Sequence, residues 1–236
     1  MRSAAEALVA LRGGASFIDV KEPASGALGR ASRAVHIDVL DALASARSRG
    51  ESARQRVTAT AALGELDTCE CPSASRPVRG YALFKLGLSR CALSDRWTRR
   101  LDAWRERLRA ANADIAAVAY ADHRDAQAPD PREVLRYAID RRLRFLLVDT
   151  WGKEKGSLTD FVSLCDLRNL LDEAHAHGLS VALAGSLRLE DVPDMLRLGA
   201  DVIAVRGAAC KDGKREEGLD ADRVAELARL LAGGAR

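Results

Sequence analysis

A regular alternation of two kinds of segment along the chain constrains its fold more than any other feature of the sequence. Short apolar or β-branched runs, each brief enough for a buried parallel strand, are separated by longer segments with the apolar spacing of an amphipathic helix. The predicted strands are residues 17–20, 57–62, 81–86, 115–120, 145–149, 181–184 and 202–205. The predicted helices are residues 4–11, 35–47, 98–110, 131–141, 164–177, 192–198 and 221–231. This alternation predicts repeated βα units around a parallel sheet.

The number of predicted strands bears on which parallel-sheet architecture the chain adopts. An eight-stranded (β/α) barrel requires a strand before the helix at 4–11, whereas an open doubly wound sheet needs fewer strands. We predict a TIM (β/α)8 barrel in a single domain, residues 1–236, with its first strand truncated or missing. Two explanations stay open: the strand lies upstream of Met1, or Met1 to Ser3 are a stub of it.

Glycine and proline mark where the predicted elements end. Gly178 and Gly199 directly follow two predicted helices, in the left-handed position that commonly ends a helix before the next strand. Between the second and third predicted strands, Pro72 and Pro77 disfavour a long crossover helix. We expect residues 64–80 to form a loop or a broken helical turn.

Composition and charge exclude several classes of partner. Hydrophobic residues make up 47% of the chain and charged residues 30%, which is typical of a folded globular protein, and no apolar run is long enough for a transmembrane helix. The net charge of +3 is the difference between 37 basic and 34 acidic residues, and aromatic residues are only 4% of the chain. Nucleic acid is therefore not expected, and a small anionic molecule is.

The cysteines favour a reducing, cytoplasmic location. They are five in number, an odd count, and Met1 is not followed by the apolar stretch of a signal peptide. Cys69 and Cys71 are two residues apart, but no second pair or nearby histidine completes four ligands. We interpret them as loop thiols and expect no bound metal.

Charged residues recur at the carboxyl ends of three predicted strands. Asp19 and Lys21 share one face of a strand, Lys85 follows the apolar residues 81–84, Asp149 ends the strand at 145–149, and Lys153 follows in a short loop. Strands packed on both faces rarely carry charges unless these are paired or functional, and in a barrel this end forms the active-site mouth. We predict that the five residues share one catalytic rim. For Asp19 and Lys21 alone, a salt bridge on a solvated loop is the alternative.

Lysines gathered in this way lower one another's pKa by repulsion, and partial burial adds to the effect. One of them can then be a neutral amine near pH 7 and attack a carbonyl, while the aspartates move protons or hold the other ammonium groups. The rim therefore predicts Schiff-base chemistry.

The sequence has no GxGxxG after a strand, no GxxxxGK[ST], no HExxH and no GxSxG, so we expect side chains to act without a cofactor.

Two further strand ends are candidates for binding a phosphate. Gly185 and Ser186 follow the strand at 181–184, and Arg206 and Gly207 follow the strand at 202–205. Barrels commonly bind phosphate with backbone N–H groups of their last two βα-loops and a helix N-terminus. The glycines allow close backbone approach, and Arg206 offers paired donors. Either glycine alone is better explained by a tight turn, but their joint position favours phosphate.

The sequence also resembles a known family through motifs that cover nearly the whole chain. They are GASFIDVKEP at 14–23, GALG at 26–29, FKLGL at 84–88, AYAD at 119–122, LVDT at 147–150, Lys153, GLSVALAGSL at 178–187 and VRGAAC at 205–210. Their order and spacing resemble the (5-formylfuran-3-yl)methyl phosphate synthases of methanofuran biosynthesis.

The resemblance implies a TIM barrel that condenses two molecules of glyceraldehyde 3-phosphate into a furan aldehyde phosphate, with loss of one phosphate and water and without a cofactor. Lys21 matches the lysine that forms the Schiff base. Lys85, Asp149, Lys153 and Asp19 match the other essential positions, which are the residues that the strand ends select independently.

The chain departs from that family in two places. Family members carry a strand before the first helix, and their crossover at 64–80 is longer and more helical. Neither departure removes a proposed site residue. The first leads us to expect that the chain from Met1 is less stable than a version extended upstream by an apolar strand.

Two other functions stay open beside the synthase. One is another Schiff-base aldolase that acts on a different sugar phosphate, and the other is a degenerate barrel that binds phosphate without turnover. As partners we expect a phosphorylated triose, no nucleic acid and no membrane, with a homo-oligomer as an open alternative.

Overall fold

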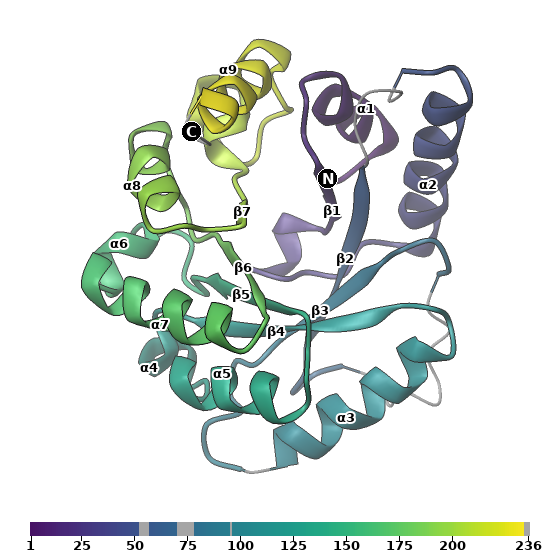
Figure 1. Ribbon diagram of the computed structural model, residues 1–236. Coiled ribbons are helices and arrows are strands. Elements are labelled where there is room, and N and C mark those ends of the chain that lie inside the picture. Colours follow the sequence, from purple (N-terminus) through teal and green to yellow (C-terminus); the bar gives the residue numbers. More distant parts are fainter. Residues whose placement is uncertain (52–56, 70–77, 95, 234–236) are drawn as a thin grey trace.

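Seven parallel strands curl into an open barrel in the computed structural model, which describes residues 1–51, 57–69, 78–94 and 96–233 (Figure 1). The strands are β1 (Phe17–Val20), β2 (Thr58–Glu65), β3 (Leu83–Gly87), β4 (Asp114–Tyr120), β5 (Phe145–Asp149), β6 (Ser180–Leu183) and β7 (Val202–Ile203). Each strand pairs with the next one along the chain, from β1 to β7. This order is that of a barrel and not of a doubly wound sheet, so the predicted fold class is confirmed.

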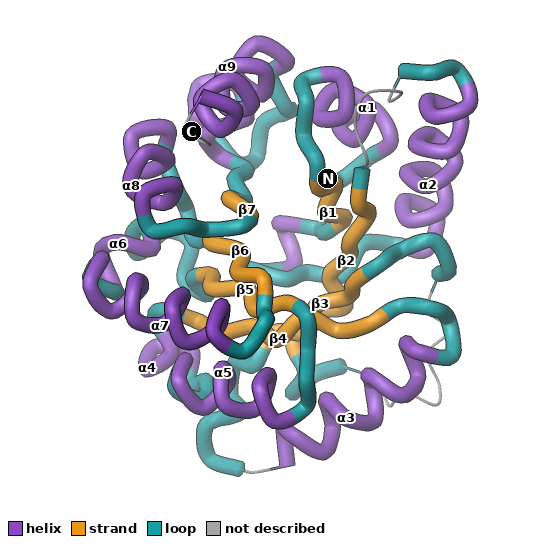
Figure 2. Tube along the Cα trace, in the orientation of Figure 1, coloured by secondary structure: helices purple, strands orange, loops and turns teal. Residues whose placement is uncertain are grey.

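Helices cover the outer face of the curled sheet (Figure 2). The longer ones are α1 (Ala4–Arg12), α2 (Arg33–Ser48), α3 (Arg96–Arg109), α5 (Pro131–Asp140), α7 (Leu164–Ala176), α8 (Val192–Arg197) and α9 (Ala221–Gly233), close to their predicted bounds. The loops after the strands hold single turns that have too few residues for a helical period to be read from the sequence. These are α4 (His123–Ala126), α6 (Leu158–Phe161) and the 3₁₀ turns η1 (Pro23–Ser25), η2 (Leu189–Asp191), η3 (Gly207–Ala209) and η4 (Lys211–Gly213).

The structure describes the glycines that were predicted to end helices, but not the two prolines of the crossover at 64–80. Gly178 and Gly199 have φ of 76° and 85°, which confirms the predicted left-handed helix ends. In the crossover at 64–80, the described residues end β2 and form turns, as expected. Pro72 and Pro77 lie outside the described residues.

No helix in the described part of the chain is long and apolar enough to span a bilayer.

The two faces of each strand have different surroundings. In β1, Ile18 and Val20 are fully buried, whereas Phe17 and Asp19 line the inside of the barrel. The strand alternation therefore directs one set of residues outward, where the covering helices pack, and the other set inward. The inward set is where the predicted charged residues lie.

A seam separates β1 from β7, which are the two ends of the strand order, and Met1 lies in it. The Met1 nitrogen donates to the Asp19 carbonyl, and the Met1 carbonyl accepts from the Lys21 N–H at 3.2 Å. These are the two hydrogen bonds of a parallel-strand partner of Val20. Met1 is thus a one-residue stub of a strand beside β1, and Ser3 already caps α1, with Oγ accepting from the Glu6 N–H at 3.3 Å.

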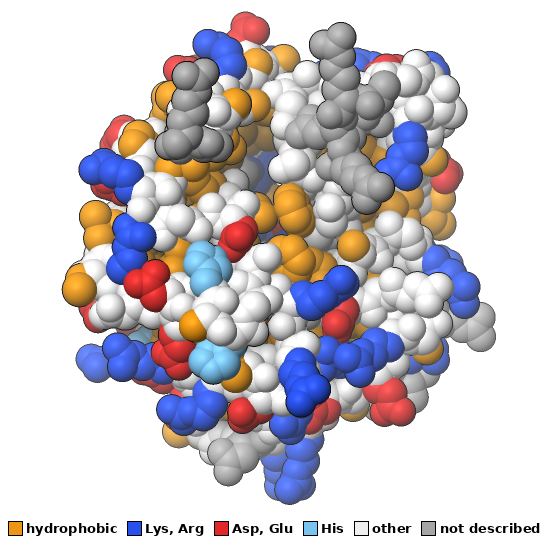
Figure 3. Space-filling model, viewed as in Figure 1, with side chains coloured by type: hydrophobic (Ala, Val, Ile, Leu, Met, Phe, Trp, Pro, Cys, Tyr) orange, Lys and Arg blue, Asp and Glu red, His pale blue; other side chains and the backbone are white. Residues whose placement is uncertain are grey.

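The seam leaves apolar side chains incompletely covered. Val202 and Ile203 are half-buried although they form a barrel strand, and Ala204 is exposed. Figure 3 shows the surface hollowed between α9 and α1, with hydrophobic side chains beside the hollow. The seam is therefore where an additional strand would find both hydrogen-bonding groups and an apolar surface.

Candidate active site

A cavity of about 700 Å³ lies inside the barrel and at the carboxyl ends of its strands. Its base is lined by apolar side chains, which include Phe17, Leu83, Ala116, Phe145, Leu147, Ala182 and Val202. All nine residues predicted for the site line it as well: Asp19, Lys21, Lys85, Asp149, Lys153, Gly185, Ser186, Arg206 and Gly207. The barrel thus brings together, over an apolar base, residues that are far apart in the sequence.

Asp19 and Lys85 form an ion pair across β1 and β3. Thr60, on β2 between these strands, donates its hydroxyl to Asp19 Oδ1 at 2.8 Å. Burial opposes ionisation of Asp19, but Lys85 and Lys21 outweigh it, so the pKa of this carboxyl lies below its ordinary value. Thr60 was not predicted, because a threonine in an apolar strand carries no distinctive signal.

Asp149 and Lys153 form a second ion pair on the opposite part of the rim. Asp149 also accepts from the Thr150 N–H at 2.8 Å. Burial would raise the pKa of Asp149, but the charges of Lys153 and Lys21 lower it below its ordinary value. Asp149 is therefore ionised at neutral pH.

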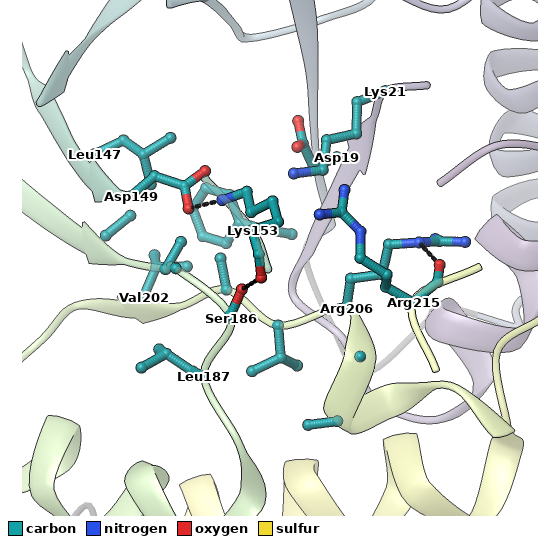
Figure 4. Close-up of a pocket in the computed structure, with 18 of the residues that line it drawn as sticks. Asp19, Lys21, Leu147, Asp149, Lys153, Ser186, Leu187, Val202, Arg206 and Arg215 are labelled. Carbon is teal, nitrogen blue, oxygen red and sulfur yellow. Dashed lines mark hydrogen bonds and ion pairs between the residues drawn. The ribbon is translucent and has the colours of Figure 1, made fainter. Parts of the chain in front are cut away.

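Lys21 follows β1, and its amine points into the cavity toward the side that holds Asp149 and Lys153 (Figure 4). Its hydrogen bond is to the Ala27 carbonyl, at 3.1 Å. Burial, and then repulsion from Lys153 and Lys85, lowers the pKa of Lys21 to about 8, although the two aspartates act in the opposite direction. Of the three half-buried lysines that line the cavity, Lys21 is the one without a carboxylate in ion-pair contact among the described residues.

Asp122 is a further part of the site that sequence reasoning missed. It is 5% exposed and accepts from the Trp151 N–H with Oδ1 and the Gly152 N–H with Oδ2, both at 2.7 Å. These bonds hold the start of the loop that carries Lys153. The position of Asp122 two residues after β4 is the only signal that the sequence offers for this role.

The loop after β6 brings its backbone to the cavity. Gly185 has φ of 104° and packs so closely on Thr150 that a Cβ would lie 2.9 Å from Thr150 Cγ2. Ser186 also has a positive φ, 50°, and its hydroxyl donates to the Lys153 carbonyl at 3.0 Å. Among the described residues, no carbonyl accepts from the N–H groups of Gly185 and Ser186. These two N–H groups are available to an anion.

Arg206 lies at the cavity wall, but its guanidinium is already engaged. It donates to both carboxylate oxygens of Glu6, at 3.1 and 3.2 Å, and to the Arg215 carbonyl at 2.8 Å. Burial would raise the pKa of Glu6, but hydrogen bonds from Arg206 and Arg2 lower it to about 2. Any contribution of Arg206 to phosphate binding therefore comes from its positive charge and from the hydrogen bond by which it holds the Arg215 carbonyl.

Arg206→Ala is expected to weaken binding of inorganic phosphate by roughly tenfold, about 1.4 kcal/mol, because it removes a positive charge from the cavity wall and the Nε–H that holds the Arg215 carbonyl. Glu6 keeps its bonds to Arg2, so the variant should stay folded. Both proteins are titrated with inorganic phosphate in a calorimeter at low ionic strength, which gives the change in phosphate affinity. An affinity equal to that of the wild type would place the anion site elsewhere.

Of the two neighbouring cysteines that were predicted to be loop thiols, the structure describes one. Cys69 is half-buried, with its thiol 3.5 Å from the Leu63 carbonyl, and Cys71 lies outside the described residues. In the described ranges, no group of three or more His, Cys, Asp or Glu side chains is placed to hold a metal ion.

The sequence as a whole matches proteins of known name. The sequence model of the 4-HFC-P synthase family matches residues 1–228. A protein of Methanopyrus kandleri named (5-formylfuran-3-yl)methyl phosphate synthase is 34% identical over 235 residues, which cover 96% of this chain and 94% of that protein. A protein of the same name from Methanocaldococcus jannaschii is 33% identical over 238 residues, 95% of this chain and 94% of its own.

Solved structures support the fold. A thiamine phosphate pyrophosphorylase from Pyrococcus furiosus superposes with a TM-score of 0.59 and 14% identity, over 99% of this chain and 91% of that one. KGPDC from Streptococcus mutans gives a TM-score of 0.55 and 15% identity, over 100% of this chain and 95% of the other. At such low identity the likeness concerns the barrel alone.

Proposed function

The chain belongs to the 4-HFC-P synthase family and is an enzyme. We propose that it condenses two molecules of glyceraldehyde 3-phosphate into (5-formylfuran-3-yl)methyl phosphate through a Schiff base on Lys21, with release of one phosphate and water. The observation that carries this proposal is the arrangement of the three half-buried lysines of the cavity. Lys85 and Lys153 are each paired with an aspartate, and Lys21, with a pKa of about 8, is the half-buried lysine left to react.

In this proposal Lys21 attacks the carbonyl carbon of the first triose phosphate as a neutral amine. Loss of water gives an imine, which makes the hydrogens on the neighbouring carbon acidic. Asp149 accepts such a proton and Lys153 returns one during isomerisation and the joining of the second triose. The ion pair between the two side chains keeps both within reach of the same carbon region.

The rest of the cavity supports this chemistry in two ways. The apolar base excludes water from the amine and accommodates a carbon skeleton that becomes a furan ring as water is lost. The N–H groups of Gly185, Ser186 and Gly207, together with the charges of Lys85 and Arg206, stabilise phosphate. No step requires a metal or cofactor in this proposal.

Product formation is expected to rise about tenfold from pH 6 to pH 7 and to level off above about pH 8, because only the neutral Lys21 amine attacks a carbonyl. The lowered pKa shifts the rise down from the ordinary lysine value of 10.5. Initial rates at substrate concentrations well below KM give this profile, because kcat/KM reports the groups of the free enzyme. A profile that is flat over this range, or one that is still rising steeply near pH 10, would contradict the role of Lys21.

The direct test is incubation with glyceraldehyde 3-phosphate alone, followed by ultraviolet absorbance and mass spectrometry of the product. A conjugated furan aldehyde phosphate, together with an adduct on the Lys21 peptide after borohydride reduction, supports the proposal. A different aldol product with the same adduct would favour the other aldolase. Phosphate binding without any product would favour the barrel that only binds.

A further inference from the structure

The loop of residues 211–218 is part of the connection between β7 and α9 and passes along the cavity. Residues 213–216 of this loop line the cavity. Its two ends meet in an antiparallel bridge between Cys210 and Leu219, and the Lys211 N–H donates to the Gly218 carbonyl at 3.1 Å. The loop is therefore closed at its base, and its tip faces the site.

Two arginines fix the backbone of this loop, one of them from across the seam. Arg206 donates to the Arg215 carbonyl at 2.8 Å, and Arg2 donates to the Glu216 and Glu217 carbonyls at 2.7 and 3.0 Å. Both arginines also donate to the buried carboxylate of Glu6 on α1. Three consecutive carbonyls are thus held by cations whose charge Glu6 partly balances, which leaves the loop little freedom to move.

The side chain of Arg215 is the part of this loop that faces the reacting groups. Figure 4 shows its guanidinium pointing into the cavity toward Asp19 and Lys21. The side chain is 23% exposed, and its carboxylate contact is Glu216 Oε1 at 3.7 Å, on a side chain that is itself 77% exposed. An ion pair so long and so exposed neutralises little of the charge.

The other half-buried cations of the cavity wall, apart from Lys21, have shorter contacts with carboxylates than Arg215 has. Lys85, Lys153 and Arg206 each contact a carboxylate within 3.1 Å. Lys21 is the proposed nucleophile. Arg188, Lys214 and Arg223 also line the cavity, but these residues are exposed. Among the described half-buried cations of the cavity, Arg215 is therefore the one whose planar set of N–H donors is available for an anion.

We propose that Arg215 binds the phosphate of the second triose, across the cavity from the N–H groups of Gly185 and Ser186. The inference rests on the proposed function, which places two phosphate groups in one cavity at the same time. One phosphate can occupy the loops after β6 and β7, and the other needs a separate cation. A guanidinium binds phosphate through two parallel N–H···O bonds, which suits this position.

The test compares wild type with Arg215→Gln, Arg215→Lys and a control, Arg197→Gln, which makes the same chemical change on the exposed surface of α8. Equilibrium dialysis with inorganic phosphate at low ionic strength should show two phosphates bound by wild type and the control, and one by Arg215→Gln. With glyceraldehyde 3-phosphate, Arg215→Gln should need at least about tenfold more substrate for half-maximal rate. Arg215→Lys should recover part of the loss, because the charge is kept.

Borohydride trapping separates the two trioses. Arg215→Gln should still form the reduced adduct on Lys21 at wild-type substrate concentration, because the first triose keeps its phosphate site. Loss of this adduct would overturn the assignment to the second triose, and binding of two phosphates with unchanged affinity would overturn the anion site itself. If wild type forms no furan product but Arg215→Gln still loses one phosphate, the proposed function fails and the anion site stands.

Discussion

Lys21→Arg is expected to lower the rate of product formation by at least about 10⁴-fold while the protein stays folded. A guanidinium stays protonated at any ordinary pH, so it keeps the positive charge and loses the nucleophilic amine. The side chain makes one hydrogen bond, to the Ala27 carbonyl, which an arginine can also donate. The measurement is furan absorbance under saturating glyceraldehyde 3-phosphate, with borohydride trapping of both proteins.

Lys155→Arg is the matched control. Lys155 lies near Lys153 in the sequence, but its side chain is 54% exposed and paired with Asp125, so the same substitution should leave the rate unchanged. A melting midpoint of Lys21→Arg far below that of wild type would show that Lys21 has a structural role, and a rate close to that of wild type would show that the nucleophile is another group.

An apolar strand of about five residues added before Met1 is expected to raise the melting temperature by roughly 6–12 °C, for a gain on the order of 3 kcal/mol. Met1 already makes the hydrogen bonds of a parallel partner of Val20, so a residue two positions upstream would lie beside Ile18. The added strand would run between β1 and β7 and cover Val202 and Ile203, which are half-buried without it.

The control is an added segment of equal length made of glycine and serine, which has the same reach and no apolar side chains to bury. Thermal melting and solubility of the three proteins are compared at one concentration. Equal midpoints for the apolar and the polar extension would show that the seam does not accept a strand and that the barrel closes by another route.

Much of the site could be predicted from the sequence because a parallel barrel converts chain order into position. Asp19, Lys85 and Asp149 lie at or near the carboxyl ends of the alternate strands β1, β3 and β5, and all such ends meet at one rim. Period-two alternation also determined that Asp19 shares a face with Phe17 and not with Ile18. The same reasoning predicted that the loops after β6 and β7, which contain Gly185 and Gly207, lie at the cavity.

Side-chain pairing within the rim was not predictable, because the first pair depends on the register of strands that are distant in the sequence and the second on the conformation of the irregular loop after β5. Asp19 pairs with Lys85, and Asp149 pairs with Lys153, which leaves Lys21 as the lysine without such a partner among the described residues. A local pattern indicates that charges converge, but not which of them neutralise one another.

The sequence by itself determined the barrel class, the order of the strands and which five charged residues meet at the rim, because these depend on local periodicity and on chain order. Only the tertiary structure decided that Arg206 bonds to Glu6, 200 residues away, and holds the loop from which Arg215 points into the cavity. The physical reason is that barrel curvature brings α1 and the loop after β7 together across the seam. Contacts between such distant segments leave no periodic signal in either of them.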